Sequence, residues 1–251
     1  MHTSPSTNRP VALVADAGFY VGPPLARLLA ERGFDMVLGD PSPEVVAEVE
    51  AAGVDHVAVT GTRDLADPAS SQRLVQAALE RFGRLDSAVA FSGRIVTGRF
   101  LKSTVDDLRR VVDGCLVAPY EFLKAVLPPM VAAGVGQVLV ITSASGARPT
   151  PGAPLYSSVR AGANHLVRNV ADEMARHRVQ VNAVGTNYMD FPEFRRATGA
   201  DDPEIRARLE AQVPLGRLGT MGEFAHFCAP FLDGTSRFTT GQFVSYAGGW
   251  S

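Results

Sequence analysis

Short apolar runs alternate with amphipathic stretches of helix length along almost the whole chain of 251 residues. A strand buried on both faces reads as a continuous apolar run, whereas a helix repeats its apolar residues at intervals of three and four. Seven runs are predicted to be strands: Val11–Ala15, Asp35–Leu38, His56–Thr60, Ser87–Phe91, Gln137–Ile141, Val179–Val184 and Gln242–Tyr246. Six stretches are predicted to be helices: Pro23–Arg32, Pro43–Ala52, Pro68–Phe82, Val105–Val131, Leu155–His177 and Gly222–Leu232. The alternation predicts a doubly wound α/β fold, in which helices flank a seven-stranded parallel sheet.

No repeat, linker or low-complexity segment divides this pattern, so we expect one domain over residues 11–251. The polar, proline-bearing start Met1–Pro10 is expected to be a short flexible tail. Thr104 followed by Asp107 resembles a capping box and predicts the start of a helix. The pair Pro128 and Pro129 is expected to break or end that helix.

Composition excludes several classes of protein. Hydrophobic residues make up 46% and charged residues 20% of the chain, and the net charge is −2, as in an ordinary globular protein. Without a basic field or a long apolar run, we expect no nucleic-acid partner and no membrane. Cys115 and Cys228 form neither a metal-binding spacing nor a disulfide framework, which indicates a cytoplasmic protein.

Three residues around the fifth strand have the spacing of a catalytic site. Ser143 follows that strand, Tyr156 comes thirteen positions later, and Arg160 lies four residues further on the same helix face. A guanidinium beside a phenol favours the phenolate, which is a general base for a hydroxyl proton. Ser143 can hydrogen-bond the same substrate oxygen. The alternative is a chance spacing, with Ser143 capping the strand-to-helix turn.

Two stretches, "RFGRLDSAVAFSG" from Arg81 and the segment Val213–Trp250, resemble the short-chain dehydrogenase/reductase superfamily. The resemblance implies a Rossmann-like domain and usually a homotetramer. Members carry a Gly-x-x-x-Gly-x-Gly turn that lets the pyrophosphate approach a helix N-terminus. Here the turn is "DAGFYVG", where Asp16 and Tyr20 replace two glycines. The carboxylate repels phosphates and the ring occupies their space, so no nicotinamide cofactor is expected and Asp40 is interpreted as a solvated loop residue.

Ser143, Tyr156 and Arg160, together with the aromatic turn "YVG", closely resemble the halohydrin dehalogenases, although Ala15 replaces the usual threonine of that motif. "GTNYMDFPEF", "LPPM" and "AGGW" are most similar to the G-type subgroup. The resemblance implies a cofactor-free lyase that closes halo-alcohols to epoxides and opens epoxides with small anions. Halide and substrate are then expected at the following residues: Tyr20, Thr186, Asn187, Tyr188 and Phe194.

The stretch Gly185–Glu204 interrupts the alternation after the sixth strand. Ligands of open α/β sheets bind beyond the carboxyl ends of the strands, so this segment is expected to cover the site. Tyr188 and Phe194 are alternatively plain packing residues of a surface loop. Two rival functions remain: an NAD(P)-dependent oxidoreductase with a degenerate cofactor turn, and a non-catalytic ligand sensor on the same fold.

Overall fold

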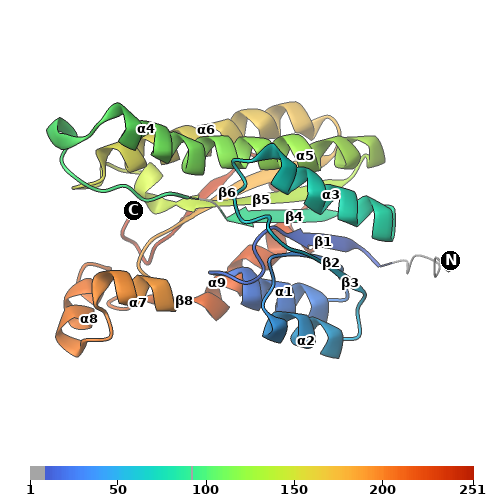
Figure 1. Cartoon of the computed structure of the whole chain (residues 1–251), viewed down its shortest axis with the longest axis horizontal. Coiled ribbons are helices and arrows are strands. Elements are labelled where there is room, and N and C mark those ends of the chain that lie inside the picture. The colour runs from blue at the N-terminus through green and yellow to red at the C-terminus, as the bar shows by residue number, and fades with distance from the viewer. Residues whose placement is uncertain (1–8, 92) are drawn as a thin grey trace.

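The computed structural model describes residues 9–91 and 93–251, so most of the predicted tail Met1–Pro10 lies outside the described residues. Seven parallel strands form one sheet in the order β3-β2-β1-β4-β5-β6-β9 (Figure 1). The strands are β1 (Val11–Val14), β2 (Asp35–Gly39), β3 (His56–Val59), β4 (Ser87–Phe91), β5 (Gly136–Ser143), β6 (Val179–Thr186) and β9 (Phe243–Tyr246). The predicted fold class is confirmed.

Helices cover both faces of this sheet (Figure 1). On one face lie α1 (Gly22–Glu31), α2 (Pro43–Ala51) and α9 (Met221–Cys228), and on the other lie α3 (Pro68–Phe82), α4 (Val105–Val112), α5 (Ala118–Ala133) and α6 (Pro154–Ala175). The chain moves outward from β1 to β3 and then returns to place β4 on the other side of β1. This reversal is the switch point at which such sheets bind their ligands.

The sheet separates two apolar clusters because neighbouring residues of a strand point to opposite faces. In β5, Leu139 and Ile141 belong to the cluster that contains α1 and α9. Val138 and Val140 belong to the cluster that contains α3, α5 and α6. Burial on both faces explains why the strands are continuous apolar runs in the sequence.

The predicted helix Val105–Val131 differs from the structure in two ways. A π-helical turn η2 (Asp113–Val117) separates α4 from α5. Pro128 and Pro129 lie inside α5 and do not end it. Pro128 is exposed and Pro129 is half-buried, and the buried side of the helix still packs on the sheet. The capping box predicted at Thr104 is confirmed.

The run Val105–Ala133 is long and apolar enough to cross a membrane by length and composition. Its apolar side is nevertheless buried in the protein, because Phe122, Val126 and Met130 pack in the cluster beneath α5. This is the pattern of a helix in the core of a doubly wound sheet.

The stretch Gly185–Glu204 is folded. It contains β7 (Met189–Asp190), α7 (Pro192–Thr198) and the start of α8 (Pro203–Glu210), and β7 pairs with β8 (Gly219–Thr220). Asp190 joins the two helices, because its carboxylate accepts hydrogen bonds from Arg195 at 3.1 Å and from Arg206 at 2.8 Å. Figure 1 shows α7 and α8 at one end of the molecule, beyond the carboxyl end of β6. Short 3₁₀ turns complete the fold: η1 (Phe100–Lys102), η3 (Ala144–Gly146) and η4 (Ala229–Phe231).

Truncation of the core side chain of α5 should show how strongly the fold depends on this packing. Phe122 is fully buried, so Phe122→Ala should lower the free energy of unfolding by about 3–5 kcal/mol. Tyr120 is on the same helix but is 45% exposed. Tyr120→Ala should therefore change the free energy of unfolding by less than about 0.5 kcal/mol. Urea unfolding measures both values, and equal losses would contradict this account of the core.

Candidate active site

Ser143 is the last residue of β5 and lies opposite Thr186 in the register of β5 with β6. Its hydroxyl donates a long hydrogen bond of 3.4 Å to the carbonyl of Thr186 and accepts one of 3.1 Å from the backbone N–H of Ser145. The second bond makes Ser143 the N-cap of η3, as the alternative interpretation of the sequence proposed. The capping role and a role toward a substrate oxygen are compatible, since a hydroxyl has two acceptor sites and a rotatable donor.

Tyr156 and Arg160 lie one turn apart on α6, and both are buried, with exposed fractions of 7% and 1%. The guanidinium carbon of Arg160 lies 5.2 Å from the centroid of the Tyr156 ring, a cation–π distance. Ser157 fastens this first turn of α6 to η3, because its hydroxyl donates to the carbonyl of Ser145 at 2.7 Å. The sheet end that carries Ser143 and the helix that carries Tyr156 are therefore held together.

Thr186 connects Ser143 with Tyr20, which the sequence placed in the altered glycine turn. The Tyr20 hydroxyl shares a buried hydrogen bond of 2.7 Å with the Thr186 hydroxyl. Burial raises the pKa of Tyr20 well above its usual value of 10, and the bond to Thr186 only partly opposes that rise. Tyr156 and Arg160 also act on Tyr20 electrostatically. Tyr20, Thr186, Tyr156 and Arg160 therefore lie near one another, and burial keeps Tyr20 a neutral phenol.

Tyr20 is also a core residue. Its ring centroid lies 4.6 Å from that of Phe91 and 4.8 Å from that of Phe191, and it packs in the cluster with Phe224. Its φ is +55°, a left-handed conformation that bulky residues rarely adopt. Such strain persists only where the surroundings enforce it, and here the ring stacking and the bond to Thr186 do so.

Asn187, Tyr188 and Phe194 form a wall beside the end of β6. The side-chain oxygen of Asn187 accepts from the backbone N–H of Tyr188 at 3.0 Å, and the Tyr188 hydroxyl donates to Gln212 at 2.7 Å. Tyr188 also has a positive φ, +53°. The rings of Phe194 and Trp250 lie 6.5 Å and 6.0 Å from the Tyr188 ring.

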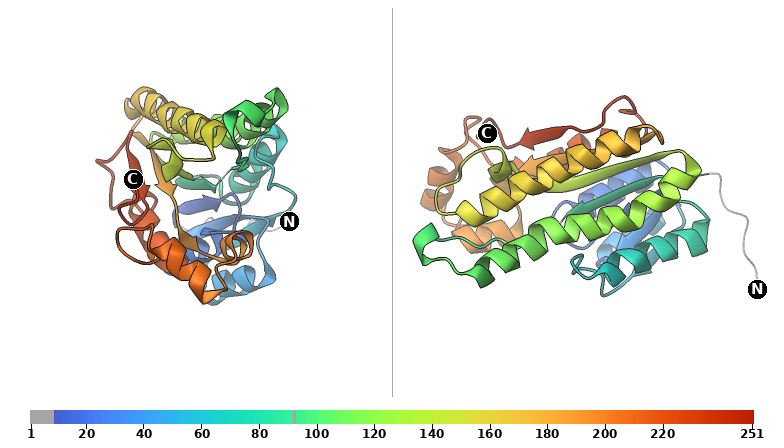
Figure 2. Two further views of the ribbon diagram at one scale, coloured as in Figure 1. Left: turned by 90° about the vertical axis from the view of Figure 1, so that its left-hand side faces the viewer. Right: turned by 90° about the horizontal axis from the view of Figure 1, so that it is seen from above.

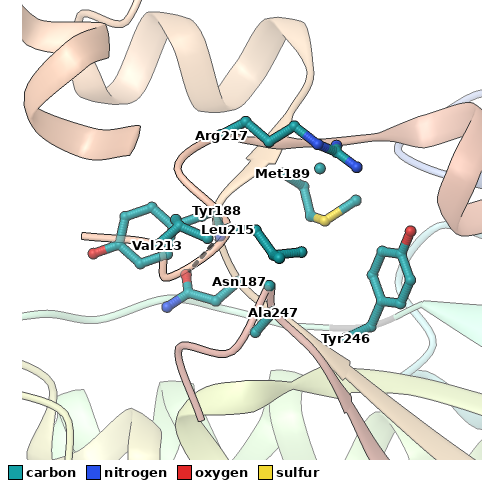
Figure 3. Close-up of a pocket in the computed structure, with 10 residues that line it drawn as sticks. Asn187, Tyr188, Met189, Val213, Leu215, Arg217, Tyr246 and Ala247 are labelled. Atoms are coloured by element: carbon teal, nitrogen blue, oxygen red, sulfur yellow. Dashed lines mark hydrogen bonds between the residues drawn. The ribbon is translucent and has the colours of Figure 1, made fainter. Parts of the chain in front are cut away.

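A small cavity of about 110 Å³ lies beneath this wall (Figure 3). Asn187 and Tyr188 line it, and Tyr246 faces them across the cavity (Figure 3). Ser143 and Tyr156 are not among the described residues that line this cavity. The structure therefore brings Tyr20 and Thr186 to Ser143, but it gives Asn187 and Tyr188 a neighbouring cavity of their own.

The C-terminal segment packs against Tyr188, and the sequence patterns did not predict this position for it. Arg148 donates a hydrogen bond of 2.7 Å to the Trp250 carbonyl, and its guanidinium lies 4.8 Å from the Trp250 ring. Gly248 and Gly249 both have positive φ, so the chain turns back at this point. Figure 2 shows the C-terminal end beside the turn that follows β5. The two adjacent glycines of "AGGW" are the feature of the sequence that indicates this turn.

The residues of the phosphate turn do not fit a nicotinamide dinucleotide in the usual arrangement, in which backbone N–H groups at the start of the helix after β1 hold the pyrophosphate. Pro23 and Pro24 at the start of α1 have no N–H to donate. The N–H of Gly22 already donates to the carbonyl of Phe19 at 2.9 Å. The side chain of Asp16 adds negative charge.

The Asp16 carboxylate is buried beside this turn. One oxygen accepts from Arg63 at 3.1 Å, and the other has no partner among the described residues. Burial raises its pKa, which the neighbouring Arg63 charge partly opposes. As a carboxylate, Asp16 has no hydrogen-bond donor for an anion and repels it.

Asp40 is bound into the loop that follows β3, which corrects its interpretation as a simple solvated residue. Its carboxylate accepts from the N–H groups of Gly61 at 2.6 Å and Thr62 at 2.7 Å, and from the Thr62 hydroxyl at 3.1 Å. Partial burial raises its pKa, but the hydrogen bonds to the charged form outweigh burial and the pKa is lowered. The described residues contain no group of three or more His, Cys, Asp or Glu side chains suited to hold a metal.

A family model described as enoyl-(acyl carrier protein) reductase matches residues 21–251. The chain belongs to the short-chain dehydrogenase/reductase superfamily. A cis-4-hydroxycyclohexanecarboxylate dehydrogenase of Sinomonas cyclohexanicum is 32% identical to it over 96% of both chains. A 2,5-dichloro-2,5-cyclohexadiene-1,4-diol dehydrogenase of Sphingobium indicum is 29% identical over 96% of both. The crystal structure of an acetoin dehydrogenase from Enterobacter cloacae is 29% identical, with a TM-score of 0.82 over 96% of both chains.

These relatives correct the prediction of a halohydrin dehalogenase. They are named dehydrogenases, and none of those cited is named a lyase, so the prediction of a cofactor-free halide lyase is wrong. The physical reason is that serine and tyrosine beside a cation describe only how a substrate oxygen is held and deprotonated. The spacing of these residues does not indicate which bond then breaks at the neighbouring carbon.

The bonds to Asp40 predict a pH-dependent contribution to stability. A lowered pKa in the folded state means that this contribution is complete above the unfolded value of about 3.9 and is lost as pH falls through the folded value. Asp40→Asn tolerates the left-handed φ of +42° but loses the charge. It should therefore cost about 1–2 kcal/mol at pH 7 and much less near pH 3.

The exposed Asp106 pairs with Arg109 on its own helix and provides the matched control. Asp106→Asn should cost less than about 0.5 kcal/mol at either pH. Thermal unfolding at the two pH values measures the difference, and a cost of Asp40→Asn that does not change with pH would refute the argument.

Proposed function

We propose that this chain is an alcohol–carbonyl oxidoreductase that acts on small cyclic secondary alcohols or the corresponding ketones. The observation that carries the proposal is the contact of the buried Arg160 guanidinium with the Tyr156 ring, on a helix whose first turn is hydrogen-bonded to the turn that follows Ser143. Two relatives that match along almost the whole chain are named dehydrogenases of six-membered ring alcohols. The names of these relatives support a ring alcohol as substrate and an oxidoreductase as the class of enzyme. The side chains of the site are suited to bind and deprotonate the substrate hydroxyl.

The residues of this chain perform the proton half of such a reaction. Tyr156, as phenolate, accepts the proton of the substrate hydroxyl, and it returns the proton to the oxygen when a ketone is reduced. Ser143 turns its hydroxyl from the long 3.4 Å bond with the Thr186 carbonyl to donate to the same substrate oxygen. The buried Arg160 guanidinium beside the ring stabilises the negative charge of the phenolate.

The hydride half needs an acceptor, which in this superfamily is a nicotinamide dinucleotide. The start of α1 lacks the N–H donors of the usual phosphate site, so the dinucleotide would have to be held by other groups. The experiment incubates the protein with cyclohexanol, and separately with a substituted ring alcohol, in the presence of NAD⁺ or NADP⁺. Gas chromatography of the ketone measures turnover, and quenching of reduced-dinucleotide fluorescence measures binding.

Ketone that forms only with protein and dinucleotide would support the proposal, and absence of ketone from every combination would contradict it. The altered turn favours one rival specifically: a protein that binds the ring alcohol without converting it. That rival predicts that the alcohol raises the melting temperature although no ketone forms.

Tyr156→Phe should lose about a hundredfold or more of the ketone-forming rate, because no hydroxyl remains to exchange the proton. The ring and its packing against Arg160 are retained, so the melting temperature should change little. Tyr120 is exposed on α5, and Tyr120→Phe is the matched control with an unchanged rate. A Tyr156→Phe enzyme of normal rate would remove Tyr156 from the reaction.

We also propose that the chain forms a homotetramer in the cytoplasm. Large apolar side chains are exposed on and before α4: Ile95, Phe100, Leu101, Val105 and Leu108. Both cysteines are free and buried, as in proteins of a reducing compartment. Light scattering should give four times the chain mass of 26.6 kDa, and a single-chain mass would contradict the assembly.

A further inference from the structure

The segment Gly93–Arg94 passes the π-helical turn η2 at very close range. A Cβ added to Gly114 would lie 2.6 Å and 2.8 Å from side-chain carbons of Arg94 and 2.8 Å from its backbone nitrogen. The Cys115 thiol donates to the Arg94 carbonyl at 3.7 Å. A side chain at position 114 would push the segment away, so the glycine permits this crossing. Single π turns inside helices are found often at functional sites.

On the other side of the crossing, Gly93 faces the Arg160 guanidinium. A Cβ added to Gly93 would overlap one terminal nitrogen of Arg160 and would lie 3.2 Å from its central carbon. The same Cβ would lie 3.9 Å from the Cys115 sulfur. The Arg160 guanidinium is therefore what makes a glycine necessary at this position.

The end of an arginine side chain normally moves aside at little cost, but Arg160 is only 1% exposed. Its guanidinium lies close both to Gly93 and to the Tyr156 ring. A methyl group at position 93 therefore displaces the guanidinium from the ring or unpacks the turn η2. Both changes alter the position of the charge relative to the phenol.

We infer that Gly93 is a positioning residue, which holds the Arg160 guanidinium against Tyr156 because it has no side chain of its own. The turn η2, through Gly114 and Cys115, holds the Gly93–Arg94 segment in place. Gly93 does not touch a substrate and acts only through Arg160. The effect on catalysis rests on the function proposed above, whereas the steric coupling of Gly93 to Arg160 does not.

A double-mutant cycle on ligand-free protein tests the coupling. Gly93→Ala should lower the melting temperature. On an Arg160→Ala background, which empties the space of the guanidinium, the same substitution should leave the melting temperature unchanged or raise it. If Gly93→Ala alone does not fold, recovery of folded protein in the double variant supports the inference equally well. Equal losses on both backgrounds, or a double variant that is also unfolded, would overturn it.

Gly162 provides the control, because it is an exposed glycine of α6 with no atoms within 4 Å of an added Cβ. Gly162→Ala should not lower the melting temperature on either background. In the ketone assay, Gly93→Ala should reduce kcat by about a hundredfold and change KM little, whereas Gly162→Ala should keep the normal kcat. A folded Gly93→Ala enzyme of normal kcat would overturn the positioning role. A wild-type protein without turnover would refute the proposed function and leave the melting-temperature cycle as the test of the coupling.

Discussion

The site depends on the pairing of β5 with β6, which runs in parallel over the full length of both strands, from Gly136 opposite Val179 to Ser143 opposite Thr186. Because the two strands end together, the last residues of each lie side by side at one edge of the sheet. Ser143 thereby contacts Thr186, and Thr186 in turn binds the hydroxyl of Tyr20. A shift of one residue in this register would turn Ser143 and Thr186 to the opposite faces of the sheet.

The switch point between β1 and β4 holds an aromatic cluster where related folds hold phosphates. Phe19, Tyr20, Phe91 and Phe191 stack around the end of β1, and two prolines begin the helix that follows. Ring burial stabilises this arrangement by the hydrophobic effect, in place of hydrogen bonds to a ligand. The strained φ of Tyr20 shows that the packing is strong enough to impose an unfavourable backbone conformation.

Near the same edge of the sheet, two glycines leave space that arginine side chains occupy. Gly93 and Gly114 lie on either side of one chain crossing, and the space they leave is filled by Arg160 and Arg94. A buried guanidinium is costly unless its surroundings hold it in contact with partners. The Tyr156 ring, in cation–π contact, is one such partner, and the glycine at position 93 leaves the space in which the guanidinium keeps this contact.

The alternation of apolar runs by itself determined the seven parallel strands and the helices on both faces, because burial on both sides of a strand leaves a continuous apolar signal. The four-residue spacing of Tyr156 and Arg160 likewise determined that they lie one turn apart on α6, where they contact each other. Only the tertiary structure decided the rest. Pro128 and Pro129 stay inside α5 because the buried side of the helix outweighs their lost hydrogen bonds. The dependence of Arg160 on Gly93, 67 positions earlier in the sequence, arises from one chain crossing, and no local pattern of residues records such a contact.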